Sequence, residues 1–220
     1  MSGSDFRVEG ADELRVAQSP EELDTPVPDA PEETEAEPED DGGSEHAPGD
    51  LRIPEGVGAF VGHPNGVRRT VGIAVARFNG EITQRLLQAA LETLVASGVE
   101  RSKIDVLQVP GAFELPLGAM ALAKTRRYAC VIALGCVIRG ETPHFDYISS
   151  EAASGVQLAA LETGVPVALG VLTCDTREQA EERSGGDHGN KGAEAAETAL
   201  EMADVFARMR VANGTPAAQA

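Results

Sequence analysis

Basic residues are scarce in this sequence and do not form runs. Its 220 residues include 18 Lys and Arg against 36 Asp and Glu, which gives a formal net charge of −18. Binding to nucleic acid or to an anionic membrane surface depends on clustered Lys and Arg that meet phosphate groups. Because no basic run accompanies the acidic excess, we expect neither nucleic acid nor membrane as a partner.

Long apolar runs and a secretory signal pattern are also missing. No window approaches the roughly 18 uninterrupted apolar residues of a membrane-spanning helix, and no basic region followed by an apolar stretch opens the sequence. We therefore expect a cytoplasmic protein. Of its three cysteines, Cys130 and Cys136 lie in one predicted strand, about 20 Å apart along it and beyond disulfide reach. All three are expected to be reduced core residues.

The motifs of several common catalytic and cofactor sites are absent. The first predicted strand is not followed by Gly-x-Gly-x-x-Gly, and residues 186–192 lack the Ser or Thr and the spacing of a Walker loop. There is no Gly-x-Ser-x-Gly motif, and Cys174 has no neighbouring histidine in sequence. No histidine shows metal-ligand spacing. The sequence therefore suggests no metal site and no nucleotide-binding motif.

Acidic residues, by contrast, are concentrated at one end. The first fifty residues carry 17 Asp and Glu and 2 Arg, a net charge of −15 that leaves only −3 for the remaining 170 residues. Such a segment has little to bury and repels itself, so we expect a disordered acidic extension and linker over residues 1–65. The short apolar pieces at Phe6, Leu14 and Val16 are compatible with a transient contact with a partner. The folded domain is expected over 66–212, with a short tail at 213–220.

The rest of the sequence alternates strand-like and helix-like segments, which predicts an α/β fold with a four-stranded parallel sheet. The predicted strands are Val71–Ala76, Ile104–Val109, Ala129–Ile138 and Val165–Thr173. Helices are predicted from Ile82 to Gly98, Glu114 to Lys124, Thr142 to Gly164 and Thr176 to Arg183, and a last one after a glycine-rich break at Ser184–Gly189. The third strand is apolar on both faces, as expected for a central strand with helices on both sides.

Loops that follow parallel strands meet at one edge of the sheet, where ligands bind. Residues 77–80, 110–114 and 139–146 are such loops. Taken alone, Phe78 is more typical of a cap on the core than of a ligand platform, and Glu114 equally suits a charge at a helix N-terminus. Local sequence alone does not decide between a structural role and a ligand-binding role for these two residues.

His144 falls in the first turn of a predicted helix that Thr142 would cap, with Pro143 as the first helical residue. Free N–H groups and the positive end of the helix dipole favour an anion there and disfavour imidazolium. A neutral imidazole can accept a proton and return it, as an acid/base catalyst must. A purely structural histidine fits the local sequence equally well.

Four segments together resemble the lumazine synthase family, namely Arg77-Phe78-Asn79 and residues 111–116, 137–147 and 189–196. Their order and spacing cover nearly the whole predicted domain. The resemblance implies a flavodoxin-like three-layer sandwich. It also implies a transferase of riboflavin biosynthesis that joins 5-amino-6-(D-ribitylamino)uracil to 3,4-dihydroxy-2-butanone 4-phosphate, giving 6,7-dimethyl-8-(D-ribityl)lumazine without a cofactor.

The same resemblance implies a role for each site residue. His144 would transfer protons. The butanone phosphate would lie at Glu141, through its backbone N–H, at Thr142 and at Arg183, with support from Lys191. The pyrimidine and its ribityl chain would contact Phe78, Ala112, Phe113, Glu114, Cys136, Val137, Ile138 and Leu169.

Two positions depart from the commoner family pattern. Asp187 stands where many members have lysine, which makes Arg183 and Lys191 more important at the phosphate. Leu169 stands where some members have phenylalanine, which leaves the packing of the ring open. Members form pentamers, some of them twelve at a time in icosahedral shells, with Arg183 and Leu169 supplied by the neighbouring subunit. The length of the 183–192 loop favours a 60-subunit shell, and riboflavin synthase is a candidate partner.

Two rival interpretations remain. Archaeal riboflavin synthases share the scaffold, but the His144 motif and Arg183 argue against that family. The other is a shell-forming scaffold or compartment protein whose acidic tail recruits cargo and whose activity is vestigial. Retention of every catalytic position apart from the two departures makes it the lesser hypothesis.

Overall fold

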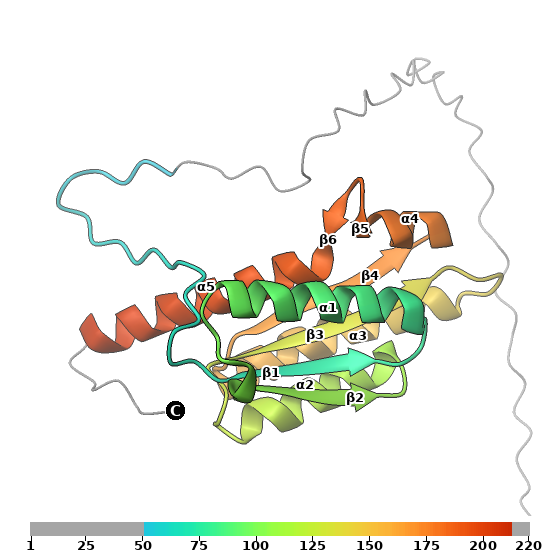
Figure 1. The fold of residues 1–220 in the computed structure, drawn as a ribbon, viewed down its shortest axis with the longest axis horizontal. Helices are drawn as coiled ribbons and strands as arrows, with labels where there is room; N and C mark the ends of the chain where they lie inside the picture. The colour runs from blue at the N-terminus through green and yellow to red at the C-terminus, as the bar shows by residue number, and fades with distance from the viewer. Residues whose placement is uncertain (1–50, 213–220) are drawn as a thin grey trace, which may run out of the picture. The chain divides into compact units, whose positions relative to one another are not determined.

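The computed structural model describes residues 51–212, which contain a four-stranded parallel sheet of order β2-β1-β3-β4. The strands are β1 (Val71–Ala76), β2 (Ile104–Val109), β3 (Cys130–Ile138) and β4 (Val167–Cys174). Figure 1 shows their arrows pointing the same way, with helices between successive strands. Helices α1 (Gly80–Ala96) and α5 (Lys191–Ala212) share one core with the sheet, and α2 (Leu115–Lys124) and α3 (His144–Thr163) share another on the opposite face. The predicted α/β fold with helices on both faces is confirmed.

Residue size alternates along β1 and sets how closely each helix layer approaches the sheet. Val71, Ile73 and Val75 belong to the core shared with α1 and α5, whereas Ala74 and Ala76 belong to the core shared with α2 and α3. Successive side chains of a strand point to opposite faces, so the small residues line one face only. Helix α2 therefore lies close, and a Cβ added at its Gly118 would sit 3.5 Å from the Ala74 Cβ.

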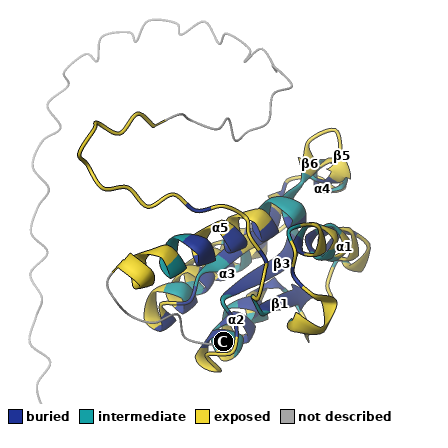
Figure 2. Ribbon diagram, turned by 60° about the vertical axis from the view of Figure 1, so that its left-hand side comes forward, coloured by how far each residue is buried: buried dark blue, intermediate teal, exposed yellow. Residues whose placement is uncertain are grey.

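Strand β3 is central, as its apolar sequence predicted, and it is buried from Cys130 to Cys136. Figure 2 shows β1 and β3 in the colour of buried residues. The three cysteines are free and buried. Burial raises the pKa of the Cys130 and Cys136 thiols to about 12, and the neighbouring Cys174 adds to the shift at Cys136. Both are therefore protonated thiols at neutral pH.

Two local predictions need correction. Helix α3 begins at His144, with Pro143 at the N-cap position and no side-chain cap, so Thr142 does not cap it. Instead the Asp146 N–H donates to the Pro143 carbonyl at 3.1 Å, which closes the first turn one residue later than expected. His144 nevertheless remains in that first turn.

The predicted glycine-rich break is a small antiparallel hairpin rather than an irregular loop. Helix α4 (Arg177–Glu182) leads into β5 (Ser184–Gly186), which pairs with β6 (Gly189–Asn190). Gly189 has φ +74°, a conformation that favours glycine. The Asn190 side-chain oxygen then accepts the Gly192 N–H at 2.9 Å and so caps the start of α5. The hairpin thus fixes where α5 begins.

The segment before β1 is anchored to α5 through Asp204. This carboxylate is buried and accepts hydrogen bonds from the His63 backbone N–H (3.2 Å), from Arg69 (2.9 Å) and from Arg208 (2.7 Å).

Two short 3-10 helices, η1 (Arg101–Lys103) and η2 (Ala112–Glu114), flank β2. Of the extension and linker predicted over residues 1–65, residues 1–50 lie outside the described residues, as does the tail at 213–220, and residues 51–65 contain no helix or strand.

Candidate active site

A pocket of about 760 Å³ lies at the carboxyl ends of β1, β2 and β3, the edge where the sequence predicted chemistry. Loops after three strands and the first turns of α3 form its walls. It brings together nine predicted residues: Phe78, Ala112, Phe113, Glu114, Cys136, Val137, Ile138, Thr142 and His144. It also includes Pro110, Gly111, Gly140, Phe145 and Ile148, which motif reasoning did not assign to the site.

Phe78 is held at the rim of this pocket by the loop that follows β1. Its backbone N–H donates to the Pro110 carbonyl at 3.1 Å, and the side-chain amide of Asn79 donates to the Cys136 carbonyl at 2.9 Å. Asn79 has φ +56°, the left-handed conformation that asparagine tolerates better than most residues. The Phe78 side chain is 70% exposed. It is therefore not a cap on the core, and its ring is available to a planar ligand.

The second wall is the 3-10 turn η2 after β2. The Glu114 carboxylate accepts the Gly111 backbone N–H at 2.9 Å and so closes this turn at the start of α2. This contact supports the interpretation of Glu114 as a charge at a helix N-terminus. Phe113 is 55% exposed and gives the pocket a second accessible aromatic ring.

His144 is the first residue of α3, is exposed, and lines the pocket. Arg139 fixes this loop. Its Nη1 donates to Asp146 at 3.0 Å and its Nε to Asp175, after β4, at 2.6 Å. The guanidinium also lies over the Phe145 ring, 4.1 Å from its centroid. The two residues that follow His144 are therefore both in contact with Arg139.

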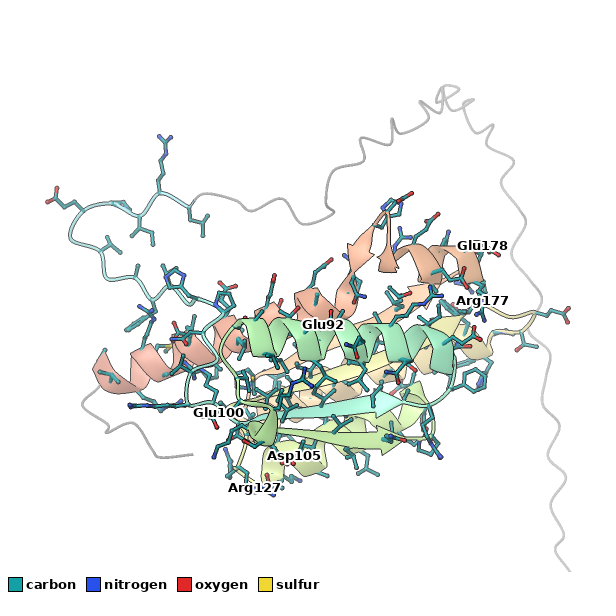
Figure 3. All side chains as sticks on the ribbon, viewed as in Figure 1. Glu92, Glu100, Asp105, Arg127, Arg177 and Glu178 are labelled. Carbon is teal, nitrogen blue, oxygen red and sulfur yellow. The ribbon has the colours of Figure 1, made fainter. Side chains whose placement is uncertain are left out.

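Charged contacts also brace the same edge farther along. Arg177 on α4 forms ion pairs with Glu81 on α1 and with Glu181. Figure 3 shows Arg177 at the opposite end of the sheet from the Arg127–Asp105 ion pair. The first of these contacts connects the short helix α4 to α1. Helix α4 carries the chain from β4 into the hairpin, so its position determines where Arg183 lies.

The remaining predicted residues lie elsewhere in the chain. Leu169, Arg183 and Lys191 line a separate groove of about 360 Å³ beside β4, an edge strand of the sheet. Leu169 is 49% exposed, and Lys191 Nζ lies 3.0 Å from the Glu194 carboxylate. Glu141 is exposed in the loop after β3 and belongs to neither lining. One chain therefore divides the predicted residues between a pocket and a separate groove, with Glu141 in neither.

The sequence model of the 6,7-dimethyl-8-ribityllumazine synthase family matches residues 68–207, which include the linings of both the pocket and the groove. The chain belongs to this family. A 6,7-dimethyl-8-ribityllumazine synthase from Syntrophus aciditrophicus (strain SB) is 58% identical over 135 residues, covering 61% of this chain and 88% of the relative. The enzyme of the same name from Gemmatimonas aurantiaca is 49% identical over 154 residues, covering 70% of this chain and 94% of the relative. As a family member, the chain is a transferase of riboflavin biosynthesis.

Within the family fold, the two departures noted in the sequence occupy defined places. Asp187 lies exposed at the tip of the β5–β6 hairpin, and Leu169 faces outward from β4. Among residues 51–212, no group of three or more His, Cys, Asp and Glu side chains is placed to hold a metal ion, and no helix there is long and apolar enough to cross a membrane. Sequence reasoning missed Asn79 and Arg139 as supports of the site, because their role depends on contacts between loops of different strands.

Proposed function

We propose that the chain joins 5-amino-6-(D-ribitylamino)uracil to 3,4-dihydroxy-2-butanone 4-phosphate in the pocket between Phe78 and His144, with release of phosphate and water. The observation that carries the proposal is the convergence of an exposed aromatic ring and a helix-start imidazole in one pocket of about 760 Å³. A flat heterocycle with a polyhydroxyl chain suits such a pocket, because stacking and a few hydrogen bonds orient it. The catalytic unit is residues 66–212.

Each wall of the pocket has a role in this proposal. Phe78 stacks on the pyrimidine ring. The turn at Ala112, Phe113 and Glu114 and the end of β3 at Cys136, Val137 and Ile138 bind the polar edge of the ring and the ribityl chain. Cys136 takes part as a neutral thiol, because burial raises its pKa to about 12.

The phosphate lies at the N-terminal end of α3, where free backbone N–H groups and the helix dipole favour an anion. Thr142 and the Glu141 backbone N–H contact it, because the Glu141 carboxylate would repel it. His144 is then placed to take a proton from the reacting amine and to return one to a leaving group.

Replacement of His144 tests this role. Because the pocket still holds both substrates side by side, and such proximity is worth about 7–11 kcal/mol in favourable cases, His144→Ala should slow turnover without abolishing it. We expect kcat to fall by about 100-fold or more, with KM for both substrates nearly unchanged. The control is His63→Ala, which keeps the backbone hydrogen bond from residue 63 to Asp204. Full turnover by His144→Ala would remove the assigned role.

The groove beside β4 supports a second part of the proposal, that neighbouring copies complete each other's sites. Arg183 of one copy would grip the phosphate bound at α3 of the next, with Lys191 in support and Leu169 against the pyrimidine. Such a head-to-tail contact generates a ring when the rotation between successive copies closes. We propose a homopentamer, assembled further into a 60-subunit shell, located in the cytoplasm, with riboflavin synthase as its partner.

The activity is tested by mixing the purified full-length protein with both substrates and following the absorbance and fluorescence of lumazine. Light scattering and negative-stain microscopy on the same sample report the assembly. Assembled particles without turnover would instead support the shell-forming scaffold with vestigial activity. Turnover by a free monomer would contradict the shared site.

A further inference from the structure

The His144 imidazole forms no hydrogen bond or ion pair with any other group of residues 51–212. In many acid/base sites a second group holds one ring nitrogen and so fixes the direction of the other. Here the placement of the ring depends instead on the backbone that carries it, which is the first turn of α3. The anchoring of that turn is therefore part of the catalytic geometry.

The usual anchors of a helix start are missing at this turn. Helix α3 has no side-chain cap, and its N-cap residue, Pro143, has no side-chain acceptor. Residues 140–143, which lead from β3 into the helix, are all exposed, so burial does not hold them. A Cβ added at Gly140 would meet nothing within 4 Å. Apart from the burial of Phe145, the turn depends on polar contacts with the ends of the strands.

Arg139 provides these contacts from the end of β3. Its backbone N–H donates to the Cys174 carbonyl at 2.9 Å, which joins it to the end of β4. Its side chain then connects Asp175, through Nε at 2.6 Å, to Asp146 on α3, through Nη1 at 3.0 Å, and lies over the Phe145 ring. One guanidinium thus links the first turn of α3 to the ends of two strands.

The Arg139 side chain does not belong to the pocket itself. Gly140, Thr142, His144 and Phe145 are among the lining residues, and Arg139 is not. Its two carboxylate partners are exposed over 59% and 65% of their side-chain surface. Exposed ion pairs contribute little to global stability. The effect of Arg139 should therefore be local, on the geometry of the turn rather than on the folding of the domain.

We propose that Arg139 is a positioning residue for His144, which holds the first turn of α3 so that the imidazole faces the substrates. This inference rests on the proposed function, in which His144 transfers protons. Arg139 acts through His144 and touches neither substrate.

A double-mutant cycle between Arg139 and His144 tests the proposal, with lumazine formation as the readout and the rate without protein subtracted. Arg139→Ala alone should lower kcat about 5- to 50-fold, less than His144→Ala, with KM for both substrates within about twofold. In the His144→Ala background the same change should alter kcat by less than about twofold. A residue that acts only through the imidazole has nothing left to position once the imidazole is gone.

The matched control is Arg127→Ala. Arg127 also pairs with an exposed carboxylate, that of Asp105, and also lies near an aromatic ring, that of Tyr128, but at the amino end of the sheet. This control should leave kcat within about twofold, and both Arg127→Ala and Arg139→Ala should keep the melting temperature within about 4 °C of the wild type.

Two further variants guard against a trivial cause. Arg139→Lys can pair with one carboxylate but cannot bridge two, so its kcat should lie between those of the wild type and Arg139→Ala. Should Arg139→Ala fold poorly, Asp146→Asn weakens only the contact with α3 and should show the same fall in kcat and the same silence in the His144→Ala background.

Losses that multiply in the double variant would mean that Arg139 acts independently of His144 and would overturn the proposal. A raised KM for the butanone phosphate at unchanged kcat would assign Arg139 to attraction of the phosphate and would also overturn it. Unchanged turnover by Arg139→Ala beside a slow His144→Ala would refute this inference alone. Full turnover by His144→Ala would remove the proposed function of His144 and this inference with it.

Discussion

Two variants of strongly reduced activity should restore each other's activity when they share one assembly. In a single chain, His144 lines the pocket at the ends of β1, β2 and β3, whereas Arg183 lines the groove beside β4. If each working site takes its imidazole from one copy and its guanidinium from the next, a copy with His144→Ala can still donate Arg183. A copy with Arg183→Ala can still donate His144.

The size of the recovery follows from this geometry. At equal amounts and random order around a ring, a site is intact only if one copy carries Arg183→Ala and the adjacent copy carries His144→Ala. Each condition holds for about half of the positions, so about one quarter of the sites should be intact. Loss of the imidazole costs about 100-fold, and loss of the charged contact from Arg183 about 1.5–3 kcal/mol, roughly 10- to 100-fold. The mixed assembly should therefore exceed both parents clearly.

The assay uses co-expression with two different tags, purification through both tags, and the rate of lumazine formation at saturating substrate. The control is a mixture of His144→Ala with Phe78→Ala. Both of these residues line the same pocket of the same chain, so every pocket in that mixture contains one defect and activity should stay at the parental level. Recovery no greater than the mean of the parents, or equal recovery in the control, would refute the shared site.

Three further outcomes follow from the fold. Asp204→Asn leaves Arg69 without its buried partner and should cost about 3–5 kcal/mol in urea unfolding at pH 7. Burial raises the pKa of Asp204, but hydrogen bonds from Arg208 and the His63 N–H and the charges of the two arginines lower it overall. The free energy of unfolding lost in Asp204→Asn should therefore become smaller only below about pH 4. Gly192→Ala would place a Cβ 2.1 Å from the Leu86 carbonyl oxygen and should destabilise by about 1–3 kcal/mol or more in thermal unfolding, whereas Gly140→Ala, with nothing within 4 Å, should not. Deletion of residues 1–50 should leave kcat and KM within about twofold, and lost turnover would contradict this expectation.

Much of the candidate pocket could be predicted because parallel strands bring their carboxyl ends together. Phe78, Ala112 and His144 lie in three loops far apart in sequence, yet each follows a strand of the same sheet. The apolar run of β3 was enough to place it in the centre. Periodicity and strand order thus account for which residues meet at this edge.

Side-chain direction and contacts between loops could not be read in the same way. Phe78 lies beyond the last residue of β1, where strand alternation no longer applies, and its exposure depends on the left-handed Asn79 and its bond to Cys136. The start of α3 was misplaced by one residue, because Thr142-Pro143 fits a capped helix but Asp146 bonds to Pro143 instead. Such details depend on tertiary contacts that local pattern does not encode.

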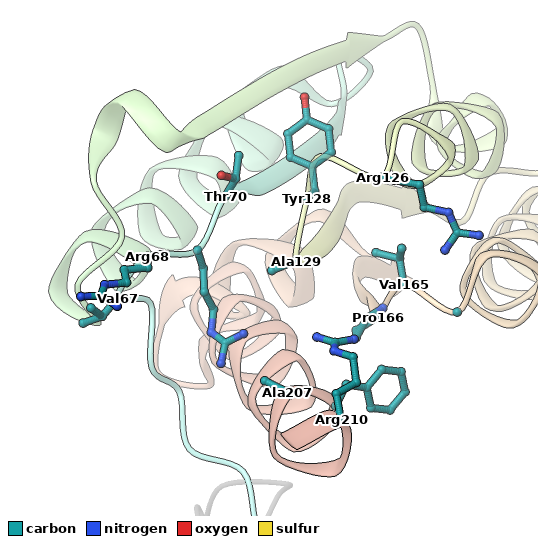
Figure 4. Close-up of a pocket in the computed structure, with 13 residues that line it drawn as sticks. Val67, Arg68, Thr70, Arg126, Tyr128, Ala129, Val165, Pro166, Ala207 and Arg210 are labelled. Carbon is teal, nitrogen blue, oxygen red and sulfur yellow. The ribbon is translucent and has the colours of Figure 1, made fainter. Parts of the chain in front are cut away.

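The meeting of distant segments at the other edge of the sheet was also invisible in the sequence: Arg68 lies before β1, Arg126 before β3 and Arg210 on α5, yet all three line one cavity (Figure 4). Helix α5 links the two edges of the sheet, with Lys191 at its first position and Arg210 close to its last. Its 22 residues span about 33 Å, whereas surface charges are screened within about 8 Å at physiological ionic strength. Charges at the two ends of α5 therefore act almost independently of each other.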